Sequence, residues 1–311
     1  MREPRLARIV VALDFSDPSV PTAAWTAQHF AAGAELILVH VLHVPRPPRF
    51  LEGRYPSRER LVETAREGAE LRLRELASSL PTGLVWTEVR TGTPDEEIVR
   101  VAAEYGADVI VIGRSGSRTG FWGRLGTTAH RVLRRTTVPV LLAGEVPAHA
   151  PSRLLVGLDD SDLIGPVLDW TGLLLERFGA NAVVMHVVHP LEFDHTATLQ
   201  HGLLKSAADA IDGTPVEDEP LRNAQDWLGD RIEERFGSSQ LRERIRPVAV
   251  EGLAAGILVA EASRRGIDLI VLGSRGAGPV QRLLLGSVAE AVLRDSPCPV
   301  LVIVRQDDVT P

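Results

Sequence analysis

Residues Asp268–Val288 read D-L-I-V-L-G-S-R-G-A-G-P-V-Q-R-L-L-L-G-S-V, and a near copy occupies Asp108–Thr128. In both stretches a glycine is followed three residues later by a second glycine, and nine residues further on by Gly-Ser or Gly-Thr. A lone glycine pattern of this kind more often marks a surface loop, but two copies with the same spacing favour a specific function. The shared positions are Gly113, Gly116, Gly126 and Thr127 in one stretch and Gly273, Gly276, Gly286 and Ser287 in the other.

Each stretch begins with a short apolar run, Val109–Ile112 or Leu269–Leu272, that is typical of a buried parallel strand. A glycine at the carboxyl end of such a strand lets the chain turn without a Cβ and lets backbone N–H groups approach a ligand. Gly-Ser or Gly-Thr at the start of a helix leaves N–H groups and the positive end of the helix dipole facing outward. The pattern therefore predicts a phosphate-binding site in each stretch, with a flexible surface loop as the alternative.

The two halves of the chain are repeats of one another. Arg8–Leu13 reads as a buried strand that ends at Asp14, and Arg153–Leu158 ends likewise at Asp159. A self-similar spacing of this length indicates one structural unit used twice. We therefore expect domain 1 at residues 1–144, a proline-containing linker at residues 145–152 and domain 2 at residues 153–311.

Strands alternate with helical patterns along each half, which predicts an α/β fold with two tandem, doubly wound, parallel five-stranded sheets. In such a sheet ligands bind beyond the carboxyl ends of the strands. Helices are expected at Ser57–Ser79 and Thr128–Arg135. The remaining strands are expected at Glu35–Val44, Leu84–Val89 and Val138–Leu142 in the first half, and at Asn181–Val188, Arg246–Val250 and Pro299–Val304 in the second.

Two features leave alternatives open. His40 and His186 lie within apolar strands, where a histidine is more often a satisfied core group than a metal ligand or an acid–base group. The second half is longer by an insertion within Leu191–Pro220, which we interpret as a longer connection or as a lid over the second site. Within it, His195–Ala210 is a candidate helix and Asp209–Pro220 a candidate loop.

Composition excludes several classes of function. The net charge is −7, which argues against nucleic acid or an anionic membrane as the main partner. The single lysine, Lys205, is not part of a Gly-Lys-Ser/Thr motif, and the single cysteine, Cys298, provides neither a disulfide framework nor a thiolate metal site. No apolar run has the length of a membrane span, and the N-terminus lacks a signal-peptide core, so we expect a cytoplasmic protein.

These motifs together make the chain similar to the universal stress protein family, in its tandem form and its ATP-binding branch. The resemblance implies a Rossmann-like sheet of order 3-2-1-4-5, an aspartate that contacts the nucleoside and a valine whose backbone meets adenine. It covers about residues 5–144 and 151–305. The nucleotide-binding residues it implies are Asp14, Val41, Gly113, Gly116, Gly126, Thr127 and Thr128 in the first half, and Asp159, Val187, Gly273, Gly276, Gly286, Ser287 and Val288 in the second.

The resemblance implies a regulatory stress-response protein that binds ATP, with or without Mg²⁺, and an unidentified protein partner. The alternative is a slow ATPase or a self-phosphorylating enzyme. Neither glycine stretch has an acidic residue between its first and last glycines, so the base and metal ligands of phosphoryl transfer are missing there. Arginines such as Arg114 and Arg275 either neutralise phosphates or belong to the solvated surface. We assign no catalytic and no metal-binding residue.

The departures from the family pattern lie in the first half. Thr127 and Thr128 stand where serine and valine are usual, and Phe121 and Trp122 are large for a mobile loop. The resemblance also implies that the two halves form a pseudo-dimer about a pseudo-two-fold axis, with their apolar fifth strands paired, because exposed apolar edge strands invite aggregation. A homodimer of the whole chain is compatible with this expectation.

Overall fold

The structure is a computed structural model of the chain, and it describes residues 3–43, 58–114, 125–189, 219–274 and 285–304. The chain divides into two compact units, unit one (Arg5–Ala148) and unit two (from His149 onward). Strands and helices alternate along the chain within each unit.

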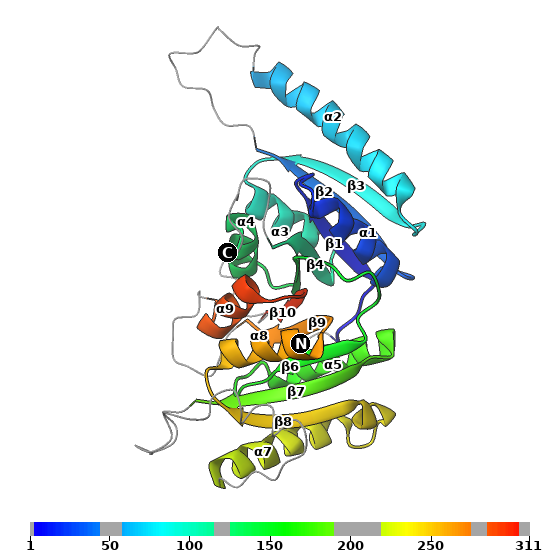
Figure 1. Cartoon of the computed structure of the whole chain (residues 1–311). Coiled ribbons are helices and arrows are strands. Elements are labelled where there is room, and N and C mark those ends of the chain that lie inside the picture. The colour runs from blue at the N-terminus through cyan, green and yellow to red at the C-terminus, as the bar shows by residue number, and fades with distance from the viewer. Residues whose placement is uncertain (1–2, 44–57, 115–124, 190–218, 275–284, 305–311) are drawn as a thin grey trace, which may run out of the picture. The chain divides into compact units, whose positions relative to one another are not determined.

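Unit one contains one parallel sheet whose strands alternate along the chain with helices (Figure 1). Its described elements are β1 (Arg8–Leu13), α1 (Ser19–His29), β2 (Glu35–Leu42), α2 (Arg58–Ser79), β3 (Val85–Thr91), α3 (Pro94–Glu104), β4 (Val109–Gly113), α4 (Thr127–Arg135) and β5 (Val140–Ala143). The strands are ordered β3-β2-β1-β4-β5, and every pair is parallel. The predicted order 3-2-1-4-5 is therefore confirmed.

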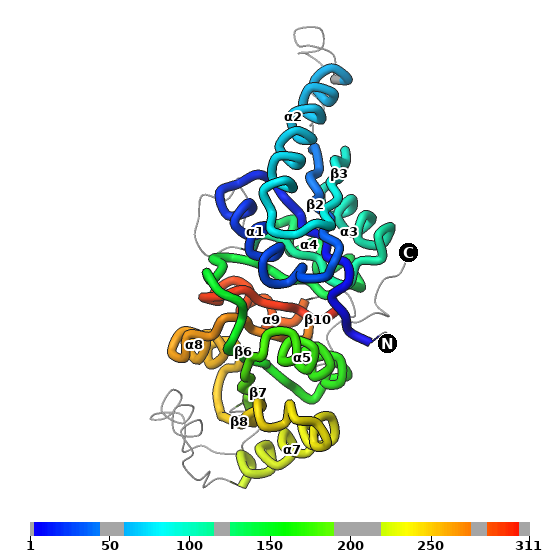
Figure 2. Tube along the Cα trace, turned by 90° about the vertical axis from the view of Figure 1, so that its right-hand side faces the viewer, coloured from blue at the N-terminus to red at the C-terminus, as the bar shows by residue number. Residues whose placement is uncertain are grey.

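Unit two repeats this arrangement. Its described elements are β6 (Arg153–Gly157), α5 (Ile164–Phe178), β7 (Asn181–Val188), α7 (Glu219–Phe236), the short 3-10 helix η3 (Gln240–Arg244), β8 (Ile245–Glu251), α8 (Ala254–Arg265), β9 (Leu269–Gly273), α9 (Ser287–Asp295) and β10 (Val300–Ile303). The sheet order is β8-β7-β6-β9-β10, again parallel throughout. Figure 2 traces α7 alongside β8, the outermost strand of this unit.

Helices cover both faces of each sheet, which explains why the central strands are apolar at nearly every position. In unit one, α1 packs on β1 and β4 and α2 on β2 and β3, whereas α3 packs against α4 and over β1 and β2. Right-handed crossovers place the helices that lead to β2 and β3 on one face and those that lead to β4 and β5 on the other. Ile9, Val10 and Val11 of β1 are consequently fully buried.

Most predicted elements are present with ends that differ by one to three residues. The residues Thr91-Gly92-Thr93-Pro94 indicate a helix start with a hydroxyl cap, and this cap is absent: Thr93 is the N-cap residue of α3, but its side chain makes no capping hydrogen bond. Pro94 and three acidic residues in the first turn mark this helix start instead. Pro220 was expected in a loop but lies in the first turn of α7, where a proline is tolerated. The rest of the insertion, including the candidate helix His195–Ala210, lies outside the described residues.

A buried aspartate ties the amino ends of the central strands together in each unit. Asp108, next to β4, accepts hydrogen bonds from the backbone N–H groups of Ala7 and Arg8, both at 2.9 Å, and from Arg5 at 2.7 Å. Asp268, next to β9, accepts from the N–H groups of Ser152 and Arg153, both at 2.9 Å, and from the Ser152 hydroxyl at 2.8 Å. Each carboxylate thus replaces a strand partner for backbone groups that would otherwise be unpaired.

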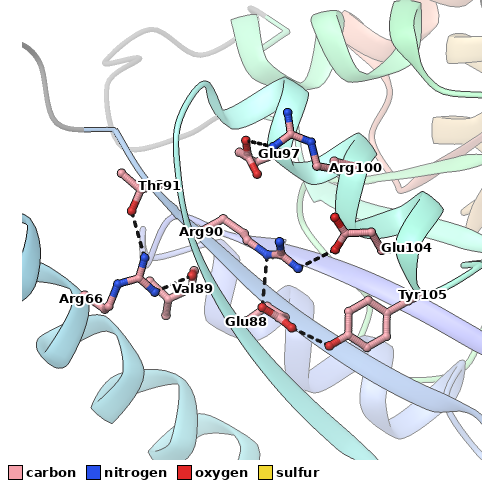
Figure 3. A network of polar contacts seen from close by, with 9 residues as sticks. All are labelled: Arg66, Glu88, Val89, Arg90, Thr91, Glu97, Arg100, Glu104 and Tyr105. Atoms are coloured by element: carbon pink, nitrogen blue, oxygen red, sulfur yellow. Dashed lines mark hydrogen bonds and ion pairs between the residues drawn. The ribbon is translucent and has the colours of Figure 1, made fainter.

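A second polar network fixes β3 to α3 on one face of unit one (Figure 3). Arg90 contacts Glu88 at 3.2 Å and Glu104 at 2.6 Å, and the Tyr105 hydroxyl donates to Glu88 at 2.6 Å. The hydrogen bond to Glu88, together with burial, raises the pKa of Tyr105 to about 12. These contacts hold the outermost strand of unit one against the helix that follows it.

No helix in the described part of the chain combines the length and the apolar character that a membrane span requires.

We predict that Asp268→Asn lowers the free energy of unfolding of unit two by about 1–3 kcal/mol, because the amide NH₂ faces buried donors that the carboxylate now satisfies. Urea unfolding followed by circular dichroism measures this difference. Ser152→Ala is the matched control: it removes one donor and leaves the carboxylate and both backbone bonds. Equal stability of Asp268→Asn and the wild type would contradict the assignment.

The same bonds predict a pH dependence. Burial opposes ionisation of Asp268, but the hydrogen bonds from Ser152 and Arg153 outweigh it and hold the pKa of this carboxyl below its usual range. Its contribution to stability is therefore present above the ordinary carboxyl pKa of about 4 and is lost as the pH falls through the lowered value. The stability gap between wild type and Asp268→Asn should narrow in that acidic window.

Candidate functional site

The carboxyl ends of β1 and β4 bring Asp14 and Gly113 to neighbouring positions in unit one. Ala12 lies opposite Ile112 in the β1–β4 ladder, so Gly113 lies beside the end of β1, and Asp14 is the first residue beyond it. The Asp14 carboxylate accepts from the backbone N–H of Ser16 at 3.0 Å and from the Ser16 hydroxyl. These bonds orient an exposed carboxylate at the carboxyl ends of the strands.

Unit two has the same arrangement. Gly157 lies opposite Met185 on one side and Leu272 on the other, so Asp159 and Gly273 follow neighbouring strands. Both aspartates are placed where the sequence predicted a ligand-binding edge.

The glycine loops are closed at their base by backbone hydrogen bonds. Gly126 N–H donates to the carbonyl of Arg114 at 2.7 Å, and Arg114 N–H donates to Ala143 at 2.8 Å. In unit two, Gly286 N–H donates to Ser274 and Ser274 N–H donates to Ile303, both at 2.8 Å. These bonds fix the amino end of α4 or α9 beside the end of the preceding strand.

Gly126 and Gly286 are the N-cap residues of α4 and α9, and neither helix has a side-chain cap. The helix N–H groups that follow therefore have no intrahelical acceptor. Thr127 and Ser287 begin these helices and are exposed, as is Val288, while Thr128 is half-buried. Gly116 and Gly276 lie outside the described residues.

The described glycines of this motif adopt ordinary backbone conformations. Gly126 has φ −60° and Gly286 has φ −63°, and neither Gly113 nor Gly273 is among the described glycines with positive φ. A turn that requires glycine was one expected reason for Gly113 and Gly273, and neither has the positive φ that only glycine adopts readily. The other expected reason, space for close approach of a ligand to the backbone, stays a prediction.

Val41 and Val187 lie near the carboxyl ends of the second strands. Gly92 N–H donates to the Leu42 carbonyl at 3.1 Å, so the peptide groups of Leu42 face β3. Successive residues of a strand alternate in direction, so those of Val41 face the opposite side, towards β1, which ends opposite His40. Gly252 N–H donates to Val188 at 2.9 Å, which gives Val187 the same orientation in unit two. The carbonyl of each valine is thus directed at the sheet edge beyond the first strand.

His40 and His186 are hydrogen-bonded structural groups. The Nδ1 atom of His40 lies 2.8 Å from the Leu13 carbonyl oxygen, and that of His186 lies 2.9 Å from the Leu158 carbonyl oxygen. Burial lowers the pKa of His40 below its usual value, which favours the neutral imidazole. Among the described residues, no group of three His, Cys, Asp or Glu side chains is placed to hold a metal ion.

The residues that cover these histidines were not found from the sequence. Phe15 stacks against His40 with ring centroids 4.6 Å apart, and Arg72 of α2 lies 4.2 Å above the Phe15 ring. In unit two, Trp227 of α7 packs on His186 at 4.8 Å. Arg72 and Trp227 come from helices distant in sequence, and their helical patterns gave no signal that they reach the strand ends.

A sequence model of the universal stress protein family matches residues 6–144 and again residues 151–304. The chain belongs to this family. Universal stress protein Rv2005c of Mycobacterium tuberculosis is 28% identical over 97% of this chain and 99% of its own length. A universal stress protein of Mycolicibacterium smegmatis is 27% identical over 95% of this chain and 96% of its own.

The crystal structure of a universal stress protein from Archaeoglobus fulgidus superposes with a TM-score of 0.66 at 22% identity and covers 98% of both chains. A functionally unknown protein from Pseudomonas aeruginosa superposes at 0.61 with 16% identity, over 97% of this chain and 94% of its own. The Rossmann-like universal stress protein fold is therefore shared across the tandem length.

We predict that Gly286→Ser leaves the free energy of unfolding unchanged or raises it by a few tenths of a kcal/mol, because serine is a slightly better N-cap than glycine and the backbone conformation suits any residue. The same holds for Gly126→Ser in unit one. Thermal and urea unfolding test this expectation. A loss of about 2 kcal/mol or more would show that the fold itself requires glycine there.

Proposed function

We propose that each unit binds an adenine nucleotide at the carboxyl edge of its sheet, and that the bound nucleotide sets the conformation that a regulatory partner protein recognises. Membership in the universal stress protein family supports this proposal at the level of the fold. The chemistry rests on the arrangement of this chain's own residues.

The observation that carries the proposal is the closed loop base present in both units. The bonds from Gly126 to Arg114 and from Gly286 to Ser274 hold an uncapped helix start beside a strand end that has no side chain. Helix N–H groups at an uncapped amino end, with the positive end of the helix dipole, form a suitable environment for phosphate oxygens. A hydroxyl, from Thr127 or Ser287, stands at the same place.

The nucleoside end of the ligand is assigned to the first two strands. An aspartate carboxylate accepts hydrogen bonds from ribose hydroxyl groups, and Asp14 or Asp159 lies next to the glycine at the strand end. The carbonyl of Val41 or Val187 accepts from the exocyclic amine of adenine. The ligand in this proposal is ATP, with or without Mg²⁺, and the proposed sites are separate, one per unit.

A regulatory role is favoured over catalysis because the stretch between the first and last glycine of each loop contains no Asp or Glu. Phosphoryl transfer requires a metal and a positioned base. Arg114 lies against Gly144, where an added Cβ would meet its Nη2 atom at 2.8 Å. This arginine can neutralise phosphate charge but does not activate a nucleophile.

We predict that Gly276→Val abolishes binding of one of two equivalents of ATP while the fold is retained, because a branched Cβ would enter the space assigned to the phosphates. Gly116→Val should remove the other equivalent. Titration calorimetry of the wild type and both variants measures the stoichiometry, and circular dichroism measures the fold.

Gly256→Val is the matched control, since Gly256 is exposed on α8 and an added Cβ there meets no atom within 4 Å. This variant should bind ATP as the wild type does. Unchanged stoichiometry and affinity in both Gly116→Val and Gly276→Val would refute the phosphate assignment.

We predict that ATP turnover lies far below the rate of about 1 s⁻¹ that marks the low end of ordinary enzymes. Phosphate release at saturating ATP and magnesium provides the measurement. A rate in the ordinary range would replace the regulatory proposal by the enzymatic one.

A further inference from the structure

The outermost strands, β3 in unit one and β8 in unit two, have one set of backbone groups that faces away from their sheet. The Leu84 carbonyl accepts from Leu36 N–H at 2.8 Å, and Gly92 N–H donates to Leu42 at 3.1 Å. Even-numbered residues of β3 therefore pair with β2. Val85, Thr87, Val89 and Thr91 direct their peptide groups outward, where an edge strand is open to pairing.

The outer edge of β8 is sealed by side chains. Gly252 N–H donates to the Val188 carbonyl at 2.9 Å, so Pro247 and Ala249 face outward. Pro247 has no N–H to offer, and its carbonyl accepts from the Gln225 side chain at 3.1 Å. The same amide accepts from Ala249 N–H at 2.7 Å. Gln225 thus takes the place that the peptide group of a further strand would occupy.

The outer edge of β3 is sealed only at its carboxyl end. Arg66 of α2 donates to the Val89 carbonyl at 2.9 Å and to the Thr91 hydroxyl at 3.2 Å (Figure 3). Thr87 lies opposite Leu38 in unit one, and Pro247 lies opposite Val184 in unit two. These are equivalent positions, so unit one has a threonine where unit two has a proline. Within the described residues, the edge segment (Gly83–Thr87) has neither a proline nor a side chain hydrogen-bonded to its outer backbone groups.

The edge segment also exposes two large apolar side chains. Leu84 is 53% exposed and Trp86 is 55% exposed. They lie two residues apart and so project from the same face of β3. An open strand edge with adjacent apolar side chains is a surface suited to an added strand.

We propose that this edge segment is a dimerisation surface, on which the edge segment of a second copy of the chain pairs antiparallel about a two-fold axis at Val85. Val85 faces outward, so its N–H and carbonyl would bond with those of Val85 of the second copy. Thr87 would pair in the same way with Gly83 of the second copy. Arg66 and the carbonyl that it occupies lie beyond this ladder.

The side chains favour a second copy over an unrelated peptide because the segment is complementary to itself. With the axis at Val85, Trp86 lies opposite Leu84 of the second copy, in the non-hydrogen-bonded position where facing side chains are closest. The exposed apolar side chains of each copy are thereby covered by those of the other copy. The charged pair Glu88 and Arg90 lies outside the paired segment. The ladder is short, so the dimer is weak and dependent on concentration.

Thr87→Pro tests the ladder without disturbing the sheet, because Thr87 N–H faces outward and the other repeat accommodates proline at this position. Sedimentation velocity over a concentration series should show a monomer–dimer equilibrium in the wild type. The dissociation constant should rise at least tenfold in Thr87→Pro and in Trp86→Glu, whereas Trp86→Phe should stay close to the wild type. Circular dichroism checks the fold of each variant.

Cysteine cross-linking tests the position of the axis. Opposed residues of a hydrogen-bonded pair have Cα atoms about 5.5 Å apart, within the range of a disulfide, whereas two copies of residue 87 would lie roughly 14 Å apart. Val85→Cys should therefore form a covalent dimer on oxidation, and Thr87→Cys and the wild type, with its buried Cys298, should not.

A wild type that stays monomeric at all concentrations would overturn the proposal. This holds even if a different protein is found to bind the edge segment. Dimerisation that neither Thr87→Pro nor Trp86→Glu weakens, or cross-linking at residue 87 without cross-linking at residue 85, would overturn it as well. None of these measurements depends on nucleotide.

Discussion

The ladder between β1 and β4, repeated between β6 and β9, is the constraint on which both units depend. It aligns the amino ends of the two strands, where Asp108 or Asp268 ties the backbone together, and their carboxyl ends, where an aspartate and a glycine meet. A shift of one strand by one residue in this register would turn its side chains to the other face of the sheet. The same set of backbone bonds thus aligns the stabilising contacts at the amino ends of the strands and the proposed site at their carboxyl ends.

The fold could be derived from the sequence because fully buried parallel strands carry a strong signal. Continuous β-branched runs such as Val109–Ile112, repeated at a nearly constant offset, required a doubly wound sheet in each half. Helix starts were less predictable, since Thr93 has the residue type of a capping side chain without making the bond. The resemblance supplied the strand order, which local patterns do not encode.

The candidate site was only partly accessible to sequence reasoning. Asp14, Gly113 and Gly126 follow strand ends or begin helices, so their placement at one edge follows from the topology. Arg72 and Trp227 reach the same edge from long helices whose surface positions look alike in sequence. The backbone conformation of the glycines could not be inferred from the sequence, because only the dihedral angles distinguish a glycine that needs an unusual backbone conformation from one that needs space.

The different treatment of the two outer edges has a consequence for how the chain folds. Tandem copies of one domain are prone to exchange equivalent elements during synthesis, because each can template the other's strands. Pro247 and the amide of Gln225 remove two central positions of β8 at which a strand from another copy could pair. Divergence at this edge therefore disfavours one misassembled product that duplication of the domain would otherwise have allowed.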